Sequence, residues 1–301
     1  MPPLRRRAGP LSPVTILDGG MGRQLQRSGA PFRQPEWSAL ALMETPDLVR
    51  AAHAAFIEAG AEVITTNSYA LVPFHIGEAR FAAEGERLAA LSGRLARDAA
   101  DAAAHPVRVA GSLPPPFGSY RPALFDPDRA PALLAPLVRG LAPSVDLFLA
   151  ETQSSIAEAQ AACRAARHTG KPVWVSFTLA EADEPRLRSG EAVADAVDAA
   201  ERDGAAAVLF NCSPPEVMAA AVDVAQSVLR GRVPLGVYAN LFPADDGDND
   251  ANAGISPVRA DVTPARYAGF AQEWQRRGAR IIGGCCGVGP EHICALGPTL
   301  D

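Results

Sequence analysis

One unit of the pattern that decides the fold reads Gly204-Ala205-Ala206-Ala207-Val208-Leu209-Phe210-Asn211-Cys212. The glycine follows an Ala-rich amphipathic segment and is placed to end a helix, because glycine readily adopts the left-handed conformation that terminates one. The short apolar run 207–210 has the length of a buried strand. The stretch therefore predicts a helix, a turn and a buried strand, with a cysteine directly after the strand.

The same alternation continues outward from this unit along the chain, and it is typical of βα units around a parallel sheet. The predicted strands are 14–17, 62–66, 107–110, 146–150, 173–177, 207–210, 235–238 and 280–282. The predicted helices are 46–59, 77–104, 155–169, 191–203, 214–229 and 264–277. Helix-ending glycines precede five of these strands, at Gly60, Gly170, Gly204, Gly231 and Gly278. Eight repeats predict an α/β fold, a single-domain (β/α)8 TIM barrel over 13–301, preceded by a flexible tail at 1–12.

Composition narrows the classes of function. Hydrophobic residues make up 48% and charged residues 21% of the 301 residues, so the chain can bury a sizeable core. A net charge of −6 and the lack of a basic stripe with interleaved aromatics argue against nucleic acid as a partner. No apolar run approaches the ~18 residues of a membrane span. Five cysteines in a long chain without a secretory signal predict a reducing compartment, the cytoplasm.

Two irregular stretches follow predicted strands, at 113–118 and 245–250. Both are expected on the rim where barrel active sites are built. The stretch 245–250 has the Asp, Asn and Gly composition of a calcium loop but lacks the glutamate at the twelfth position. It is therefore interpreted as a solvated loop.

Three cysteines follow predicted strands. Cys212 follows the sixth strand, and Cys285 and Cys286 follow the eighth, so all three are expected at one face of the barrel. Strands two steps apart are separated by under ~10 Å, which allows three thiolates to converge. Zinc prefers such ligands, and a catalytic zinc site keeps its fourth position for water or substrate. The sequence therefore predicts a Zn²⁺ site made of these three cysteines.

Other interpretations of the cysteines remain open. Cys163 and Cys294 lie on predicted helices and are expected to be buried packing residues. The adjacent pair Cys285 and Cys286 could instead form a redox disulfide, although a reducing compartment disfavours it.

Several motifs, in order along nearly the whole chain, resemble those of the zinc-dependent homocysteine S-methyltransferases that use S-methylmethionine or S-adenosylmethionine. They are Leu17-Asp18-Gly19-Gly20-Met21-Gly22, Glu36-Trp37-Ser38-Ala39, Ile64-Thr65-Thr66-Asn67-Ser68-Tyr69, Gly111-Ser112-Leu113, Glu151-Thr152, Val175-Ser176-Phe177, Phe210-Asn211-Cys212-Ser213-Pro214-Pro215 and Gly283-Gly284-Cys285-Cys286-Gly287. The family fold is a (β/α)8 barrel. The resemblance implies that Cys212, Cys285 and Cys286 bind zinc and that the homocysteine sulfur becomes the fourth ligand.

The resemblance also implies roles for residues that bind the amino acid and the donor. Glu151 would pair with the substrate ammonium group. Asp18 and the backbone amides of Gly19 and Gly20 would hold its other polar end. Trp37 either faces the cationic methyl donor, since an indole face attracts an onium centre, or covers the core.

The chain departs from its relatives at three places. Tyr238-Ala239-Asn240-Leu241-Phe242 stands where many relatives have Tyr-Pro-Asn-Ala-Gly, and Asn240 keeps the residue implied to fill the open metal position without substrate. Thr152 replaces the tyrosine of betaine-using relatives, which disfavours betaine as donor. Gly287-Val288-Gly289 replaces the commoner Arg-Thr-Thr after the paired cysteines.

The resemblance implies methyl transfer from a sulfonium donor, S-methylmethionine or S-adenosylmethionine, to L-homocysteine, forming methionine. Zinc turns the acceptor thiol into the reactive thiolate, so attack needs no general base. One alternative is methyl supply by a separate corrinoid or folate system, and another is a barrel that binds zinc and thiol without catalysis. The sequence is compatible with a monomer or a small homo-oligomer.

Overall fold

The computed structural model describes residues 14–182, 184–243 and 257–300. In these residues eight parallel strands form one sheet with the order β1-β8-β7-β6-β5-β4-β3-β2. The strands are β1 (Thr15–Ile16), β2 (Val63–Thr65), β3 (Arg108–Leu113), β4 (Leu147–Gln153), β5 (Val173–Phe177), β6 (Ala207–Asn211), β7 (Leu235–Ala239) and β8 (Ala279–Gly284). All eight predicted strands are confirmed, with ends that differ by at most three residues.

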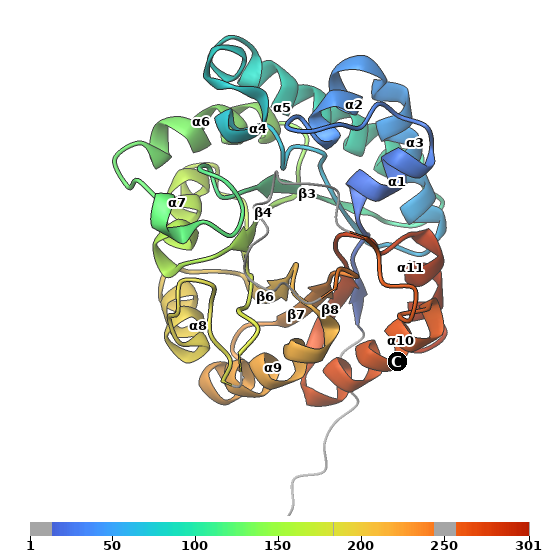
Figure 1. The fold of residues 1–301 in the computed structure, drawn as a ribbon, viewed down its shortest axis with the longest axis vertical. Helices are drawn as coiled ribbons and strands as arrows, with labels where there is room; N and C mark the ends of the chain where they lie inside the picture. Colours follow the sequence, from blue (N-terminus) through green and yellow to red (C-terminus); the bar gives the residue numbers. More distant parts are fainter. Residues whose placement is uncertain (1–13, 183, 244–256, 301) are drawn as a thin grey trace, which may run out of the picture.

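The sheet closes on itself between β1 and β2. Leu17 forms a parallel bridge with Val63, and the Asp18 amide donates a 3.0 Å hydrogen bond to the Val63 carbonyl. Figure 1 shows the resulting ring of strands at the centre, surrounded by helices. The predicted (β/α)8 barrel is therefore confirmed as a single α/β domain.

Helices cover the outside of the ring. They are α1 (Met21–Arg27), α2 (Ser38–Glu44), α3 (Pro46–Glu58), α4 (Pro73–Ile76), α5 (Glu78–Asp101), α6 (Ala130–Leu141), α7 (Ile156–Arg167), α8 (Val193–Arg202), α9 (Pro215–Leu229), α10 (Pro264–Arg277) and α11 (Pro290–Leu296), with a 3-10 turn η1 (Pro122–Leu124). The six predicted helices are confirmed. The pattern did not predict α6, whose interior Pro136 removes a helical hydrogen bond. No helix in the described part of the chain is long and apolar enough to span a membrane.

Glycine ends helices where the sequence predicts it. Gly60, Gly170, Gly204, Gly231 and Gly278 all have positive φ, between 71° and 118°. A glycine at these positions avoids the steric cost that a side chain would have there.

Apolar side chains fill two regions of the fold. A small cluster that includes Leu149, Trp174 and Ile281 fills the inside of the barrel, and Cys285 packs against it. A larger cluster lies between the strands and the helices. The short last helix α11 contacts α3 and α10, so it covers the flank between the last and the first βα units.

The tail 1–12 and the stretch 245–250 lie outside the described residues. The predictions of a flexible tail and a solvated acidic loop therefore stay predictions.

Candidate metal centre

The three predicted zinc ligands converge at the carboxyl end of the barrel. Cys212 follows β6 and the pair Cys285 and Cys286 follows β8, and β7 lies between these strands. Their Sγ atoms all lie within 4.8 Å of one another. Residues more than seventy positions apart in the sequence are thus brought together by the order of the strands in the sheet, as the alternating strands predicted.

The local backbone aims these sulfurs at one point. Cys212 has φ 51°, in the left-handed region that a non-glycine residue rarely adopts. Gly287, directly after the pair, has φ 87° and turns the chain back. The Cys285 amide donates a 2.9 Å hydrogen bond to the carbonyl of Ala239 on β7.

The spacing of the sulfurs fits a tetrahedral zinc ion. Zinc–sulfur bonds of about 2.3 Å at tetrahedral angles place two sulfurs ~3.8 Å apart. The Cys212 and Cys286 sulfurs are 3.8 Å apart, and those of Cys285 and Cys286 are 4.0 Å apart. The three cysteines are free, so the adjacent pair does not form the alternative disulfide here.

The sulfurs interact strongly with one another. Hydrogen bonds from Cys285 and Cys286 lower the pKa of Cys212 well below its usual value. The same interaction with Cys212 raises the pKa of Cys285 and of Cys286 well above it. The buried thiols therefore oppose one another's ionisation, and a divalent cation is what allows all three to ionise.

A polar residue that the sequence analysis missed touches this cluster. The hydroxyl of Tyr120 donates a 2.8 Å hydrogen bond to the sulfur of Cys212. Tyr120 lies two residues beyond the stretch 113–118 that the sequence predicts on the rim. Nothing in the local sequence signals that this side chain reaches the cysteines.

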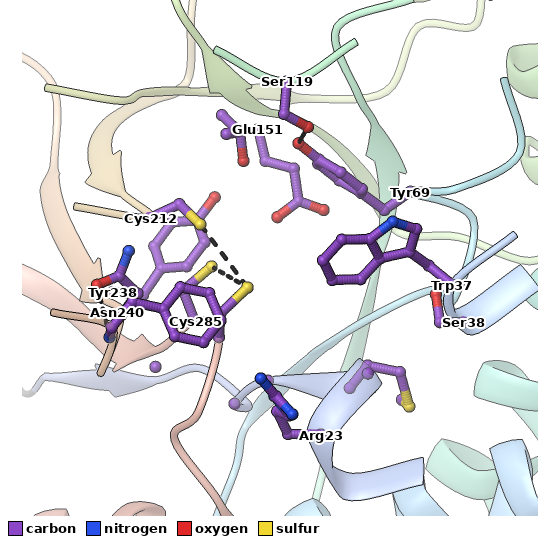
Figure 2. A pocket seen from close by; sticks show the side chains of 18 of the residues that line it. Arg23, Trp37, Ser38, Tyr69, Ser119, Glu151, Cys212, Tyr238, Asn240 and Cys285 are labelled. Carbon is purple, nitrogen blue, oxygen red and sulfur yellow. Dashed lines mark hydrogen bonds between the residues drawn. The ribbon is translucent and has the colours of Figure 1, made fainter. Parts of the chain in front are cut away.

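The cysteines line a cavity of about 560 Å³ at the mouth of the barrel. Figure 2 shows Cys212 and Cys285 on one side of this cavity, with Glu151 and Trp37 facing them. Each predicted site residue, namely Cys212, Cys285, Cys286, Asp18, Gly19, Gly20, Trp37, Glu151 and Asn240, lines the same cavity. The volume suits a molecule of amino-acid or small-ligand size.

Glu151 lies on β4 and is almost fully buried. Burial raises the pKa of its carboxyl group to about 8, against a hydrogen bond from the Ser112 hydroxyl that lowers it. A buried carboxyl group with a raised pKa at a cavity wall is typical of a binding or catalytic site. It does not cap α7, because Glu158 and Ser155 form the capping box there.

Asp18 follows β1 and faces the same cavity. Its carboxylate accepts hydrogen bonds of 2.7 Å from the Thr65 amide and 3.1 Å from the Thr65 hydroxyl. Burial raises its pKa to about 7, and its charge also raises the pKa of Glu151. Two buried carboxyl groups therefore share one cavity, which favours a cationic ligand group between them.

The two glycines after Asp18 differ in what they can offer a ligand. The Gly20 amide donates a 2.9 Å hydrogen bond to the Val288 carbonyl, and its expected contact with the substrate stays a prediction. A Cβ atom on Gly20 would lie 2.6 Å from the Cys285 carbonyl oxygen. Gly20 is needed because the loop carrying the paired cysteines packs directly against it.

Trp37 and Asn240 both line the cavity. Trp37 packs edge to face against Phe32 and His75, with ring centroids 5.7 and 6.3 Å apart. Its ring therefore contacts the core and also borders the cavity, so both interpretations of this residue have support. The Asn240 side-chain oxygen accepts a 3.2 Å hydrogen bond from the Phe242 amide.

The two remaining cysteines lie on helices away from the cavity. Cys163 on α7 is buried, as predicted, and burial raises its pKa to about 11. The prediction that Cys294 is buried is wrong, because on the short helix α11 this side chain faces outward and is exposed.

The fold and this cavity define an α/β-barrel enzyme with a tricysteine centre. The family model for homocysteine S-methyltransferase matches residues 15–300. The chain is 30% identical to the homocysteine S-methyltransferase of Escherichia coli (strain K12), covering 94% of each chain. It is 29% identical to homocysteine S-methyltransferase 1 of Brassica oleracea var. italica, covering 95% of this chain and 93% of that one.

A solved structure agrees with the sequence comparison. The metallated form of the homocysteine methyltransferase MmuM from Escherichia coli superposes with a TM-score of 0.77 and 29% identity, over 95% of this chain and 96% of that one. The chain belongs to the homocysteine S-methyltransferase family and is a methyltransferase.

Proposed function

We propose that this protein transfers a methyl group from S-methylmethionine or S-adenosylmethionine to the thiol of L-homocysteine, forming methionine. The observation that carries the proposal is the convergence of the Cys212, Cys285 and Cys286 sulfurs within 4.8 Å at a cavity that also holds two buried carboxyl groups. Zinc is the metal whose tetrahedral geometry fits this donor set. When bound, it would ionise the acceptor thiol and hold it in place.

The Glu151 and Asp18 carboxyl groups bind the amino-acid end of homocysteine. Glu151 carries the negative charge for the substrate ammonium group, and Asp18 faces the same space. Because the Asp18 charge already raises the pKa of Glu151, a substrate carboxylate beside this pair would be repelled. We therefore assign both carboxyl groups to the ammonium group and leave the Gly19 amide for the carboxylate end.

The cavity walls orient the donor. The methyl group must lie between the acceptor sulfur and the donor sulfur on one line, with water excluded. Trp37 borders the cavity opposite the cysteines (Figure 2) and offers an aromatic face to a sulfonium cation. The donor leaves as a neutral thioether, so no acid is needed to protonate it.

A matched pair of cysteine variants tests the proposal. Zinc-loaded protein and homocysteine are incubated with S-methylmethionine, S-adenosylmethionine or betaine, and methionine is followed. Cys285→Ala is expected to lose zinc and activity together, whereas Cys294→Ser removes a cysteine outside the cavity and keeps both. Methionine formation by a metal-free protein at the full rate would refute the zinc mechanism.

The same assay separates the alternatives. A gain in turnover only on adding a methylated corrinoid protein or a folate would select a separate methyl-supply system. Homocysteine binding with no product from any donor would select a non-catalytic zinc barrel. One relative of similar length is a selenocysteine methyltransferase from Astragalus bisulcatus, 28% identical over 96% of this chain, so a selenol is also worth testing as acceptor.

Three free thiols that serve a metal need a reducing environment, which supports the cytoplasm as the location. The oligomeric state remains a prediction of monomer or small homo-oligomer.

A further inference from the structure

The cavity contains three sulfurs that compete with the proposed acceptor. Cys212, Cys285 and Cys286 all line the space into which the methyl donor must enter. A thiolate is a strong nucleophile, so the methyl group of the donor can react with a cysteine sulfur as well as with homocysteine. A methylated ligand would be a neutral thioether and a far poorer ligand for zinc.

One of these sulfurs has a strong hydrogen-bond donor. The Tyr120 hydroxyl lies 2.8 Å from the Cys212 sulfur and donates to it. Among the described residues, the Cys285 sulfur accepts a hydrogen bond from the Asn211 side-chain amide at a longer distance of 3.9 Å. A hydrogen bond to a thiolate occupies a lone pair and withdraws charge, so it lowers the reactivity of that sulfur toward a methyl donor.

The surrounding residues hold Tyr120 in this position. The Arg188 guanidinium lies over the Tyr120 ring, 4.2 Å from its centroid, and Arg188 Nε donates a 3.3 Å hydrogen bond to the Thr178 hydroxyl. A cation over the ring attracts its electrons and makes the hydroxyl a better donor. Arg188 thus contacts one face of the Tyr120 ring and is itself held by Thr178.

The backbone at both ends of this hydrogen bond is strained. Tyr120 has φ 64° and Cys212 has φ 51°, both in the left-handed region. Non-glycine residues in that region cost free energy and are concentrated at functional sites. Neither position is occupied by the glycine or asparagine that would relieve the strain.

We propose that Tyr120 is a specificity-determining residue that protects Cys212 from methylation, so that the methyl group goes to the acceptor thiol. This inference rests on the proposed function. Tyr120 acts through its hydroxyl on the ligand sulfur, and Arg188 positions it.

The reaction that Tyr120 suppresses is a direct displacement. The Cys212 thiolate would supply the electron pair for a new sulfur–carbon bond to the methyl group. The bond between that carbon and the donor sulfonium would break, and its electron pair would stay on the donor sulfur as a neutral thioether. No oxidant or proton is required.

The test measures methylation of Cys212 rather than turnover. Zinc-loaded full-length wild type and Tyr120→Phe are incubated with S-methylmethionine or S-adenosylmethionine without homocysteine. A second arm uses methyl iodide. It measures the reactivity of the Cys212 sulfur even if the protein accepts neither sulfonium compound as a donor. Mass spectrometry of the peptide carrying Cys212 is expected to show methyl incorporation about tenfold faster in Tyr120→Phe, because a hydrogen bond to a charged group is worth about that factor.

Two further variants control the experiment. Tyr69→Phe removes a hydroxyl from the same cavity, but that hydroxyl bonds to Ser119 Oγ at 2.6 Å (Figure 2), so Cys212 methylation is expected to stay at the wild-type rate. Arg188→Gln removes the cation over the ring and keeps the hydroxyl, so an intermediate rate is expected.

The outcomes separate this inference from the proposed function. Equal methylation of Cys212 in wild type and Tyr120→Phe would overturn the role of Tyr120, even if the wild type makes methionine normally. A similar increase in Tyr69→Phe would also overturn it. Loss of zinc from Tyr120→Phe would show that the hydrogen bond holds the metal site together instead of protecting it. If the wild type makes no methionine, the proposed function fails, while the methyl iodide arm still decides the role of Tyr120.

Discussion

Burial of the Glu151 carboxyl group destabilises the fold, and the same burial prepares this group to bind a cation. It is 8% exposed, and burial raises the pKa of its carboxyl group to about 8. Burial disfavours the charged form in the empty cavity, while a cationic ligand group would restore it. Two predictions follow from this balance.

The first prediction concerns the pH dependence of homocysteine binding. Glu151 must be ionised to hold the ammonium group, so affinity is expected to rise as pH increases toward about 8, where its carboxyl group ionises. Glu151→Gln should weaken binding about 10- to 100-fold above that pH and flatten the dependence. Calorimetry of the zinc-loaded wild type and variant across pH measures the homocysteine affinity of each. Ionisation of the homocysteine thiol contributes equally to both proteins, so the difference between them reports on Glu151. An unchanged slope in the variant would exclude Glu151 as the titrating group.

The second prediction concerns the pH dependence of stability. Stability is expected to fall as pH rises, whereas homocysteine affinity is expected to rise. The folded pKa of about 8 exceeds the ordinary value of 4.5, so between these values the folded protein retains a proton that the unfolded chain has lost. Wild-type stability therefore falls as pH rises through this window. Glu151→Gln should gain ~1–3 kcal/mol over wild type between about pH 5 and about pH 8. Urea unfolding at several pH values measures it, and a constant difference between the two proteins would contradict the assignment.

At the scale of elements, the site depends on close contact between the segments after β1 and β8. A Cβ atom on Gly20 would lie 2.6 Å from the Cys285 carbonyl oxygen and 3.0 Å from the Gly287 amide nitrogen. Both contacts are with backbone, which cannot rotate away. The position of the paired cysteines is therefore set by a glycine at the opposite end of the sequence.

A pair of glycine variants tests this contact. Gly20→Ala is expected to displace the cysteine loop, lower zinc affinity at least about tenfold and reduce the melting temperature. Gly269 lies exposed in α10, where a Cβ atom meets nothing within 4 Å. Gly269→Ala should leave zinc affinity unchanged and stabilise the protein by ~0.5–1 kcal/mol, because alanine is the better helix former. Chelator competition and thermal unfolding measure both effects; unchanged zinc affinity in Gly20→Ala would show that the loop adjusts.

At the scale of the whole molecule, a bound zinc ion would join β6 to β8 across the barrel mouth. Because the three cysteines converge only in the folded protein, zinc is expected to stabilise folding by about 2.7 kcal/mol at a concentration of 100 times its Kd. Thermal unfolding with and without a chelator should show this as a shift of a few degrees. The shift should vanish in Cys285→Ala and persist in Cys294→Ser. An equal shift in both variants would mean that the ion binds elsewhere.

Much of this architecture could be predicted from sequence because the signals are local. A parallel strand buried on both faces is a short apolar run. In a helix that covers it, apolar residues recur every three or four positions, and the helix often ends at glycine. Cys212 and the pair Cys285 and Cys286 each follow such a run directly. Since the carboxyl ends of all strands in a barrel point the same way, strand order alone brought these cysteines to one face.

The amino-acid sequence by itself determined the barrel, its strand positions and the three cysteines of the site. Only the tertiary structure decided that Tyr120 reaches Cys212, that the Gly20 amide bonds to Val288, and that Cys294 is exposed. The difference is physical: strands and helices follow from patterns within a dozen residues, whereas hydrogen-bond partners and exposure depend on how distant segments pack, which no local pattern encodes.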